Sequence, residues 1–442
     1  MLSTFQNAFR IEELRNRIIF TLLMLVVFRI GAHIPTPGID NQALSAFFAA
    51  QAGTILQFFD MFSGGALQRL TVFALGIMPY ISASIIIQLL TVVFPYLERL
   101  SREGEAGRKK ITMYTRYGTV VLSIVQGFGI AVGLQTMSAP DGAPLVLTGV
   151  NPWGFRLLTM ITLTAGTTFL MWLGEQINER GIGNGISLII FAGIVTDIPS
   201  AAINSVRLIQ AGQLAVLAVA VVALVMVGVI FAVIYMETSQ RKIPVQYAKR
   251  AVGNRVFGGQ ASHLPLKINS AGVIPPIFAS SLLAFPATIV GFFQIPWVQA
   301  VAGQLSPQAF SYNVMYVLLI FFFSFFYTAI QFNPIKIADE MKKFGGYIPG
   351  IRPGKKTAEY INQVLTRITF GGALYLSAVC VLPVVLYWAL NVPFSFGGTA
   401  LLIVVGVGLD TVRQIEAFLL NRNYDGFMRK SKRRGGARTL RV

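Results

Sequence analysis

Residues 214–236 read LAVLAVAVVALVMVGVIFAVIYM, an unbroken apolar run without a charged side chain. A helix that spans a bilayer needs about 20 consecutive apolar residues, so this stretch predicts a transmembrane helix. Nine further apolar stretches flank it, and all ten are expected to be helices because backbone amides cannot stay unpaired in lipid. The ten segments are 18–34, 71–94, 117–134, 155–173, 182–198, 214–236, 271–293, 313–332, 368–390 and 394–412.

Positive charge alternates from one loop to the next. Of the 36 Lys and Arg residues, all but four lie at the N-terminus, in the C-terminal tail, or in the loops after segments 2, 4, 6 and 8. The exceptions are Arg29, Arg69, Arg156 and Arg207. Cytoplasmic loops carry an excess of Lys and Arg. Both termini and these loops are therefore expected on the inner side of the membrane.

Composition limits what else the chain can contain. It is 54% hydrophobic and 12% charged, whereas soluble domains are about 25% charged, so no large soluble domain is expected. A single cysteine, Cys380, excludes an internal disulfide, and together with only His33 and His263 it cannot complete a zinc site. Neither a metal nor a cofactor is predicted. The net charge of +18 favours acidic partners on the inner side, such as anionic lipids, RNA or an acidic protein surface.

Catalytic motifs are missing from the sequence. It has no Walker A, HExxH or GxSxG pattern, and Gly181–Gly185 follows no predicted strand, so we interpret this Gly-rich stretch as a flexible start of a helix. No catalytic residue is predicted. Acidic residues fall only in loops or at segment ends, which counts against an ion-coupled solute carrier without excluding it, because unwound backbone carbonyls can bind Na⁺. The chain resembles a passage more than an enzyme.

Two helices are interrupted at matching places. The stretch 75–79 (LGIMP) in segment 2 is similar to 271–275 (AGVIP) in segment 7. If the chain divides near Gly212, each is the second helix of its half, and a half with five helices requires the other half to be inverted. Interrupted helices in inverted halves point to a central pathway, although Gly and Pro are common in membrane helices and chance remains an alternative. We therefore predict an N-terminal half, 1–212, a C-terminal half, 213–420, and a basic cytoplasmic tail, 421–442.

Several loops carry further signals. Residues 60–70 are apolar but too short to span, which fits a re-entrant half-helix or, alternatively, an interfacial surface helix. The inner loops 237–270 and 333–367 are long enough to indicate a function beyond setting topology. The tail, with Arg429–Arg434, is suited to anionic lipid or RNA phosphate, or simply to anchoring.

Isoleucines recur in the interrupted and Gly-rich helices. Ile77 and Ile81 form an i,i+4 pair, as do Ile186 and Ile190, so each pair shares one helix face. Together with Ile277 in segment 7 and Ile403 in segment 10 they suggest a narrow apolar ring that would exclude ions. Composition alone favours the alternative, in which they are ordinary core or lipid-facing residues.

Seven motifs resemble one family. They are Phe62–Leu67 (FSGGAL), Ala74–Ser84 (ALGIMPYISAS), Gly104–Lys110 (GEAGRKK), Gly181–Ser187 (GIGNGIS), His263–Lys267 (HLPLK), Gly350–Gly354 (GIRPG) and Phe396–Ile403 (FGGTALLI). This set is similar to the SecY family, the central subunits of the Sec protein-conducting channel. The resemblance covers nearly the whole chain, except the outer loops near 136–152 and 294–312 and the last residues. It implies an all-α membrane protein with ten transmembrane helices in two inverted five-helix halves around a central hourglass pore.

The resemblance also implies roles for individual residues. The pore ring would be Ile77, Ile81, Ile186, Ile190, Ile277 and Ile403. The plug that seals the resting channel would be about 60–70, with Phe62, Ser63, Gly64, Gly65, Ala66, Leu67 and Arg69. The lateral gate, formed by segments 2 and 3 against 7 and 8, would include Ser82, Gln88, Asn269 and Phe285. Docking of the ribosome or the SecA ATPase would use Lys249, Arg250, Arg255, Arg352, Lys355 and Lys356.

One departure and several partners complete the expectation. Asn254 stands where relatives often have a second arginine beside Arg255, which puts the strength of the ribosome contact in doubt. The expected partners are SecE, SecG, SecA, the ribosome, signal sequences and nascent chains, and anionic lipids. The expected place is the bacterial plasma (inner) membrane, with the energy supplied by the ribosome or SecA. A solute carrier, an ion channel and a membrane scaffold are the competing hypotheses.

Overall fold

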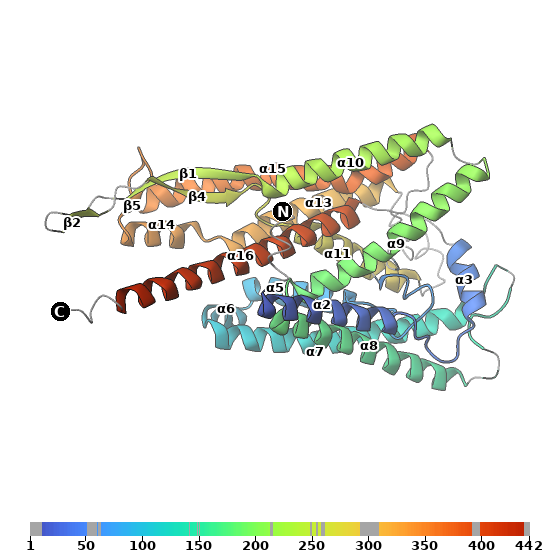
Figure 1. Cartoon of the computed structure of the whole chain (residues 1–442). Helices are drawn as coiled ribbons and strands as arrows, with labels where there is room; N and C mark the ends of the chain where they lie inside the picture. Colours follow the sequence, from blue (N-terminus) through green and yellow to red (C-terminus); the bar gives the residue numbers. More distant parts are fainter. Residues whose placement is uncertain are drawn as a thin grey trace. The chain divides into compact units, whose positions relative to one another are not determined.

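A computed structural model of the chain describes residues 11–50, 60, 63–140, 142–147, 149, 151–212, 215–247, 250–252, 255–257, 261–291, 309–390 and 398–436. Each of the ten predicted segments overlaps a helix in these residues (Figure 1). The helices are α2 (Glu12–Gly31), α3 (Asn41–Ala50), α5 (Met78–Val93), α6 (Pro95–Arg102), α7 (Glu105–Thr136), α8 (Pro152–Arg180), α9 (Gly185–Gln210), α10 (Val216–Thr238), α11 (Ile274–Gly291), α13 (Phe310–Gln331), α14 (Pro334–Lys343), α15 (Lys355–Leu390) and α16 (Gly398–Gly436). The prediction of helices is confirmed.

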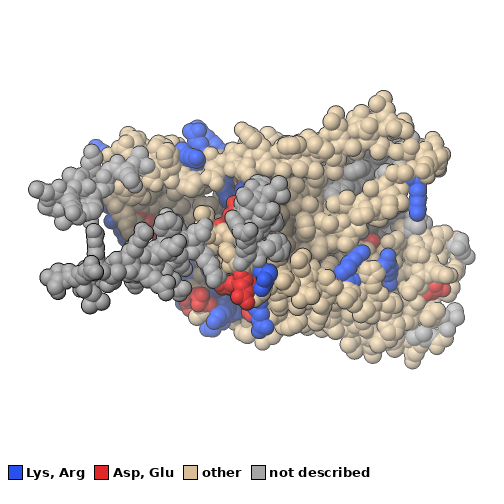
Figure 2. Space-filling model, in the orientation of Figure 1, with Lys and Arg blue, Asp and Glu red and all other residues tan. Residues whose placement is uncertain are grey.

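Length and apolar composition mark five stretches of the described residues as able to cross a membrane. They are α7, α8, α10, α13 together with α14, and α15. A sixth is the pair α5 and α6, which are bent by 99° at the break between Val93 and Pro95. Much of the surface in Figure 2 carries no charge. Within α10, for example, Leu217, Leu224 and Phe231 are 75%, 74% and 70% exposed, as expected for a helix that faces lipid.

Contacts divide the chain into two compact units. The first is Met1–Ser200 with Ile403–Val442, and the second is Ala201–Leu402. This division follows compactness, whereas the predicted boundary near residue 212 concerns an internal repeat and stays a prediction. α9 and α16 each begin in one unit and end in the other.

The first unit is built on close helix contacts at small residues. α7 and α8 run side by side (Figure 1), and a Cβ added at Gly127 of α7 would lie 3.4 Å from the Cα of Met160 in α8. At Gly118 the neighbour would be the Cβ of Ala83 in α5, also at 3.4 Å. Lipid provides no hydrophobic drive for membrane helices to associate, so their association depends on close packing. Small residues at the contact allow the two backbones to approach closely enough for it.

The second unit combines helices with strands that the sequence analysis did not predict. α11, α13 and α15 pack together, with Phe278 of α11 edge-to-face on Phe323 of α13. The three-stranded antiparallel sheet has the order β4-β1-β5, and a separate hairpin joins β2 to β3. The strands are β1 (Gln240–Tyr247), β2 (Arg250–Val252), β3 (Arg255–Phe257), β4 (Ala261–Lys267) and β5 (Gly346–Tyr347).

A small apolar core joins the two long inner loops. Its buried side chains come from β1, β4, the end of α14, the segment after β5 and the first turns of α15. They are Ile243, Val245, Leu266, Met341, Ile348, Ile361 and Leu365. The described parts of loops 237–270 and 333–367 that carry these side chains therefore form one folded platform on α15. We call it the inner platform, after the predicted side of its loops.

Candidate functional site

Asp60 and Ser63 are helical, and the chain from Gly64 to Ile77 forms a succession of turns until α5 begins at Met78. Most of these residues are buried or half-buried, and Ala66 and Leu70 are 0% and 1% exposed. The predicted half-helix therefore does not extend over residues 64–70, and neither does an exposed interfacial helix. Phe62 lies outside the described residues. We call residues 63–70 the plug segment.

A carboxylate holds the turns of the plug segment together. Oδ1 of Asp60 accepts hydrogen bonds from the Gln68 amide at 2.8 Å and from Oγ of Ser63 at 3.4 Å. Ser63 Oγ in turn accepts from the Leu67 amide at 3.1 Å. Burial raises the pKa of the Asp60 carboxyl, and the hydrogen bond from Gln68 opposes this shift. Side-chain oxygens thus replace the backbone partners that a helix would provide.

The plug segment is also attached to its surroundings. Arg29 of α2 donates from Nη1 to the Gly64 carbonyl at 2.9 Å. A Cβ on Gly64 would lie 2.8 Å from the Cα of Gly193 in α9, so the two backbones touch there. At the far end, the Thr36 amide donates to the Leu70 carbonyl at 2.9 Å. The side chain of Arg69 is exposed.

Five of the six predicted ring isoleucines are buried. Ile77, Ile81, Ile190, Ile277 and Ile403 are between 1% and 8% exposed. Ile186 is half-buried, and its Cγ1 lies near Gly174 of α8. Burial fits a closed constriction, and it fits an ordinary core equally well. Ile277 belongs to the second unit and the other five to the first.

The predicted gate residues are placed as follows. Ser82 and Gln88 are half-buried on α5, and Gln88 Nε2 donates to Ser84 Oγ at 3.5 Å. Asn269, 4% exposed, lies before α11, where its Nδ2 donates to the Glu237 carboxylate and to the Gly272 carbonyl. Phe285 is in α11, and its side chain is outside the described part of the structure.

Three of the six predicted docking residues lie in the described part of the inner platform. Arg352, Lys355 and Lys356 are exposed before and at the start of α15, and Lys356 pairs with Glu359 at 3.2 Å. The Arg352 carbonyl accepts from Thr357 Oγ1 at 2.9 Å, which fixes this turn through the backbone. Arg250 and Arg255 are in the β2–β3 hairpin, with side chains outside the described set, and Lys249 is outside it entirely.

Sequence reasoning missed several features near these sites. Arg241 and Lys242 on β1 are exposed on the inner platform, and Arg29 contacts the plug segment. The stretch 181–185 was interpreted as flexible, yet its amides are bonded: Ile182 donates to Thr21 Oγ1 at 3.0 Å and Gly183 donates to Gln414 Oε1 at 2.9 Å. Among the described residues, no three His, Cys, Asp or Glu side chains come together in a way that could hold a metal.

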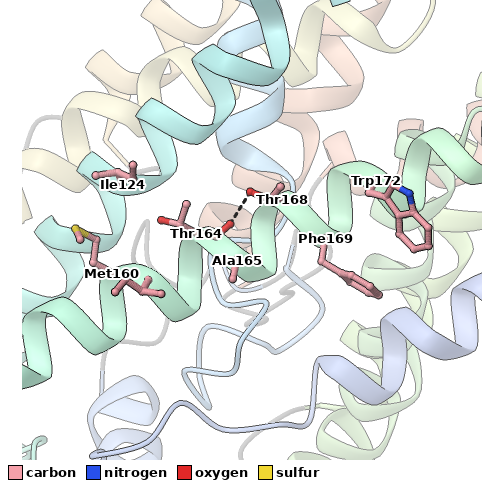
Figure 3. A pocket seen from close by; sticks show the side chains of 8 residues that line it. Ile124, Met160, Thr164, Ala165, Thr168, Phe169 and Trp172 are labelled. Carbon is pink, nitrogen blue, oxygen red and sulfur yellow. Dashed lines mark hydrogen bonds between the residues drawn. The ribbon is translucent and has the colours of Figure 1, made fainter. Parts of the chain in front are cut away.

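An open apolar groove lies on the surface of α7 and α8. Its lining is Ile124 of α7 and, from α8, Met160, Ile161, Thr164, Ala165, Thr168, Phe169 and Trp172. Figure 3 shows Ile124 near Met160, with the labelled α8 side chains following along that helix to Trp172. Thr168 Oγ1 is bonded to the Thr164 carbonyl of its own helix at 2.8 Å, as the dashed line shows. The Thr164 hydroxyl is buried without a hydrogen-bond partner, and the other side chains of this wall are apolar, so the groove is suited to contact with apolar chains.

Comparison with solved structures defines the class of protein. A protein-conducting channel superposes with a TM-score of 0.65 at 17% identity, covering 91% of this chain and 92% of the other. Sec61 from the canine ribosome–channel complex of the endoplasmic reticulum gives a TM-score of 0.62 at 17% identity, covering 91% and 92%. The fold is that of protein-conducting channels, which agrees with the predicted multi-pass helical class.

Sequence comparison then identifies the family. The SecY family model matches residues 71–412. The chain is 50% identical over 431 residues to protein translocase subunit SecY of Escherichia coli K12, covering 96% of each. It is 50% identical to that of Pseudomonas aeruginosa (96% and 95% covered) and 46% identical to that of Aquifex aeolicus (96% and 98% covered). The chain belongs to the SecY family, so the resemblance found in the motifs is confirmed.

Proposed function

We propose that this chain is the pore-forming subunit of a bacterial protein translocase. It passes unfolded secretory proteins across the inner membrane and releases membrane-protein helices sideways into lipid. The observation that carries the proposal is the plug segment, a buried non-helical stretch that leads directly into a helix bearing Ile77 and Ile81. Family membership and the channel fold support it.

The chemistry of the residues fits a passage for varied polypeptides. A ring of aliphatic side chains forms no selective hydrogen bond, so it would admit a chemically mixed chain while excluding hydrated ions. The six isoleucines Ile77, Ile81, Ile186, Ile190, Ile277 and Ile403 would form this ring. Signal sequences are apolar, so their free energy falls when they move from water into lipid. Ser82, Gln88, Asn269 and Phe285 would line the gate through which they leave.

The inner platform would receive the partner that supplies energy. Arg352, Lys355 and Lys356 are exposed on it. Arg250 and Arg255, in strands β2 and β3, add positive charge to the same loop as β1 and β4. Acidic protein surfaces and ribosomal RNA are attracted to such a patch. SecA and the ribosome are the partners proposed for this platform. SecE and SecG are proposed as partners within the membrane, and anionic lipids are proposed to bind the basic tail. Both termini are placed in the cytoplasm by the charge pattern.

Crosslinking at the ring tests the proposal. In a Cys380→Ser background, a cysteine at Ile81 should form a disulfide with a cysteine in a stalled secretory chain during active translocation. A cysteine at Leu224, on the exposed face of α10, is the matched control and should not crosslink. Failure of the Ile81 variant in an assay that still translocates would contradict the channel role and favour a scaffold.

Charge reversal tests the docking role. Arg352→Glu should abolish SecA-driven transport while SecE and SecG still co-purify, because the exposed side chain is replaced and the turn is held by backbone. Lys343→Glu makes the same charge change in the same loop, at the exposed end of α14. Normal transport by Arg352→Glu would refute docking at this residue. Equal losses in both variants would indicate that only net charge matters.

A further inference from the structure

The hydrogen bond between Arg29 and Gly64 joins two parts of the chain that the sequence keeps 35 residues apart. We propose that Arg29 is a positioning residue that holds the plug segment in its resting place. This inference rests on the proposed function of residues 60–70 as the seal. Arg29 lies in the last turn of α2, half-buried, and its Nη1 reaches the Gly64 carbonyl at 2.9 Å.

The opposite side of Gly64 is closed by α9. Gly64 has a φ of +68°, and a Cβ there would lie 2.8 Å from Gly193 Cα, closer than real Cβ atoms come. The segment is thus held at one residue from two sides, by a donor on α2 and by backbone contact with α9. Gly65, with a φ of +79°, has open space around the same position. The contact is therefore specific to Gly64.

The position of Arg29 is unusual for a basic residue in this chain. It is one of four outside the inner-side pattern, and arginine within a membrane segment is costly and generally functional. A cation near a helix C-terminus is favoured by the helix dipole, but that effect needs only charge and would be satisfied by lysine. It does not account for a guanidinium donor directed at a carbonyl of another segment. Hydrogen bonds from a charged donor are about twice as strong as neutral ones.

Accessibility of the plug segment measures this role directly. The experiment uses the whole translocase complex in proteoliposomes, with Cys380→Ser and a probe cysteine replacing Ala66, which is 0% exposed. A membrane-impermeant maleimide added on the outer side reports how often the segment leaves its seat. Arg29→Met should raise the labelling rate about tenfold, the effect of losing one charged hydrogen bond. Arg29→Lys should lie between Arg29→Met and the parent.

A second probe separates positioning from general loss of structure. Ala139, 6% exposed in the outer loop of the same unit, is replaced by cysteine in a parallel set. Its labelling should not change with Arg29→Met. An equal rise at both probes would overturn the positioning role, as would an unchanged rate at the Ala66 probe.

A pair of glycine variants tests the contact between Gly64 and α9 without replacing the arginine. Gly64→Ala and Gly65→Ala both place alanine at positive φ, so the backbone strain is similar. Only Gly64→Ala meets Gly193, so it alone should raise labelling at the Ala66 probe several-fold. Equal labelling in the two variants would contradict the seat, and this pair decides the question if Arg29→Met fails to insert.

A separate measurement, of ion leak, tests the proposed function of residues 60–70 as the seal. Deleting residues 60–70 should increase ion leak through the resting complex. If the deletion does not increase the leak, the plug role is wrong whatever the labelling shows. If it does, and Arg29→Met leaves labelling unchanged, the seal stands and the positioning role of Arg29 is refuted.

Discussion

The chain turns into α5 and into α11 in the same way. Gly76 has a φ of +56° and Gly272 a φ of +65°, both in the left-handed region that favours glycine. Each helix begins two residues later, at Met78 and at Ile274, and has proline as its second residue. The stretches 75–79 and 271–275, which match in only part of their sequence, thus start a helix with the same backbone conformation.

The approach to these two helix starts differs. Gly76 follows the plug segment, which accepts a hydrogen bond from Arg29 of α2 at Gly64 and touches the backbone of α9 there. Gly272 follows Asn269, which is buried against the Glu237 carboxylate at the end of α10. The same helix start is therefore preceded by a separable attachment in one unit and by a buried polar pair in the other. We therefore expect the buried polar pair to contribute more to stability than the bond between Arg29 and Gly64.

The largest effect is expected at the buried polar pair. Asn269→Leu removes a donor from the buried Glu237 carboxylate and should destabilise the protein by about 3 kcal/mol, measured by reversible unfolding in detergent. The double variant Glu237→Gln, Asn269→Leu should lose less, because a neutral amide depends less on this donor than a buried carboxylate does. If Asn269→Leu is neutral, the polar pair does not fix the start of α11 and the contrast with the plug side fails.

The glycines are expected to matter equally. Gly76→Ala and Gly272→Ala should each cost about 1–2 kcal/mol, the strain of a side chain in the left-handed region. A Cβ at Gly272 would meet no atom within 4 Å, so strain alone acts there. Unfolding of both variants under the same conditions checks this. A cost at Gly76 without one at Gly272 would show that the two turns are not equivalent.

The sequence predicted helices well because their signal is local. An apolar run such as 214–236 must be helical in lipid whatever surrounds it, and α10 begins and ends near those limits. The same holds for the two helix starts, since a glycine followed three residues later by a proline is visible in both stretches. Family motifs extended this to the site residues, whose roles remain proposals.

The turns of the plug segment were not predicted, because some of the partners that stabilise them are distant. Asp60 lies just before the segment, but Arg29 and the Thr36 amide come from much earlier in the chain. Nothing in the apolar pattern of 60–70 indicates these donors. The bonds made by the stretch 181–185 were missed for the same reason, since its amides are bonded to Thr21 and Gln414, 161 and 231 residues away. Its prediction as the start of a helix agrees with α9, which begins at Gly185.

The inner platform was missed although part of its signal was present. Ile243 and Val245 alternate with exposed residues, as do Leu264 and Leu266, and this period of two is typical of strands. β1 and β4 pair across the hairpin accordingly. The third strand, β5, pairs with β1 from roughly a hundred residues further along, and only the folded core shows that two loops form one surface.

The smallest effect is expected at the prolines. Pro79 and Pro275 each occupy the second position of their helix, where the missing amide hydrogen has no intrahelical partner in any case. Replacing either with alanine frees the unfolded chain and should cost about 0.4–1 kcal/mol. Pro334 is the first residue of α14 on the inner platform, where its amide would also have no intrahelical partner, so Pro334→Ala is the control and should show a similar loss. The Pro79→Ala and Pro275→Ala effects should also add in the double variant, because the two helix starts belong to different compact units. A gain in stability on replacing Pro79 alone would mean that this proline is strained in the folded protein. The two helix starts would then differ in themselves and not only in the segments that precede them.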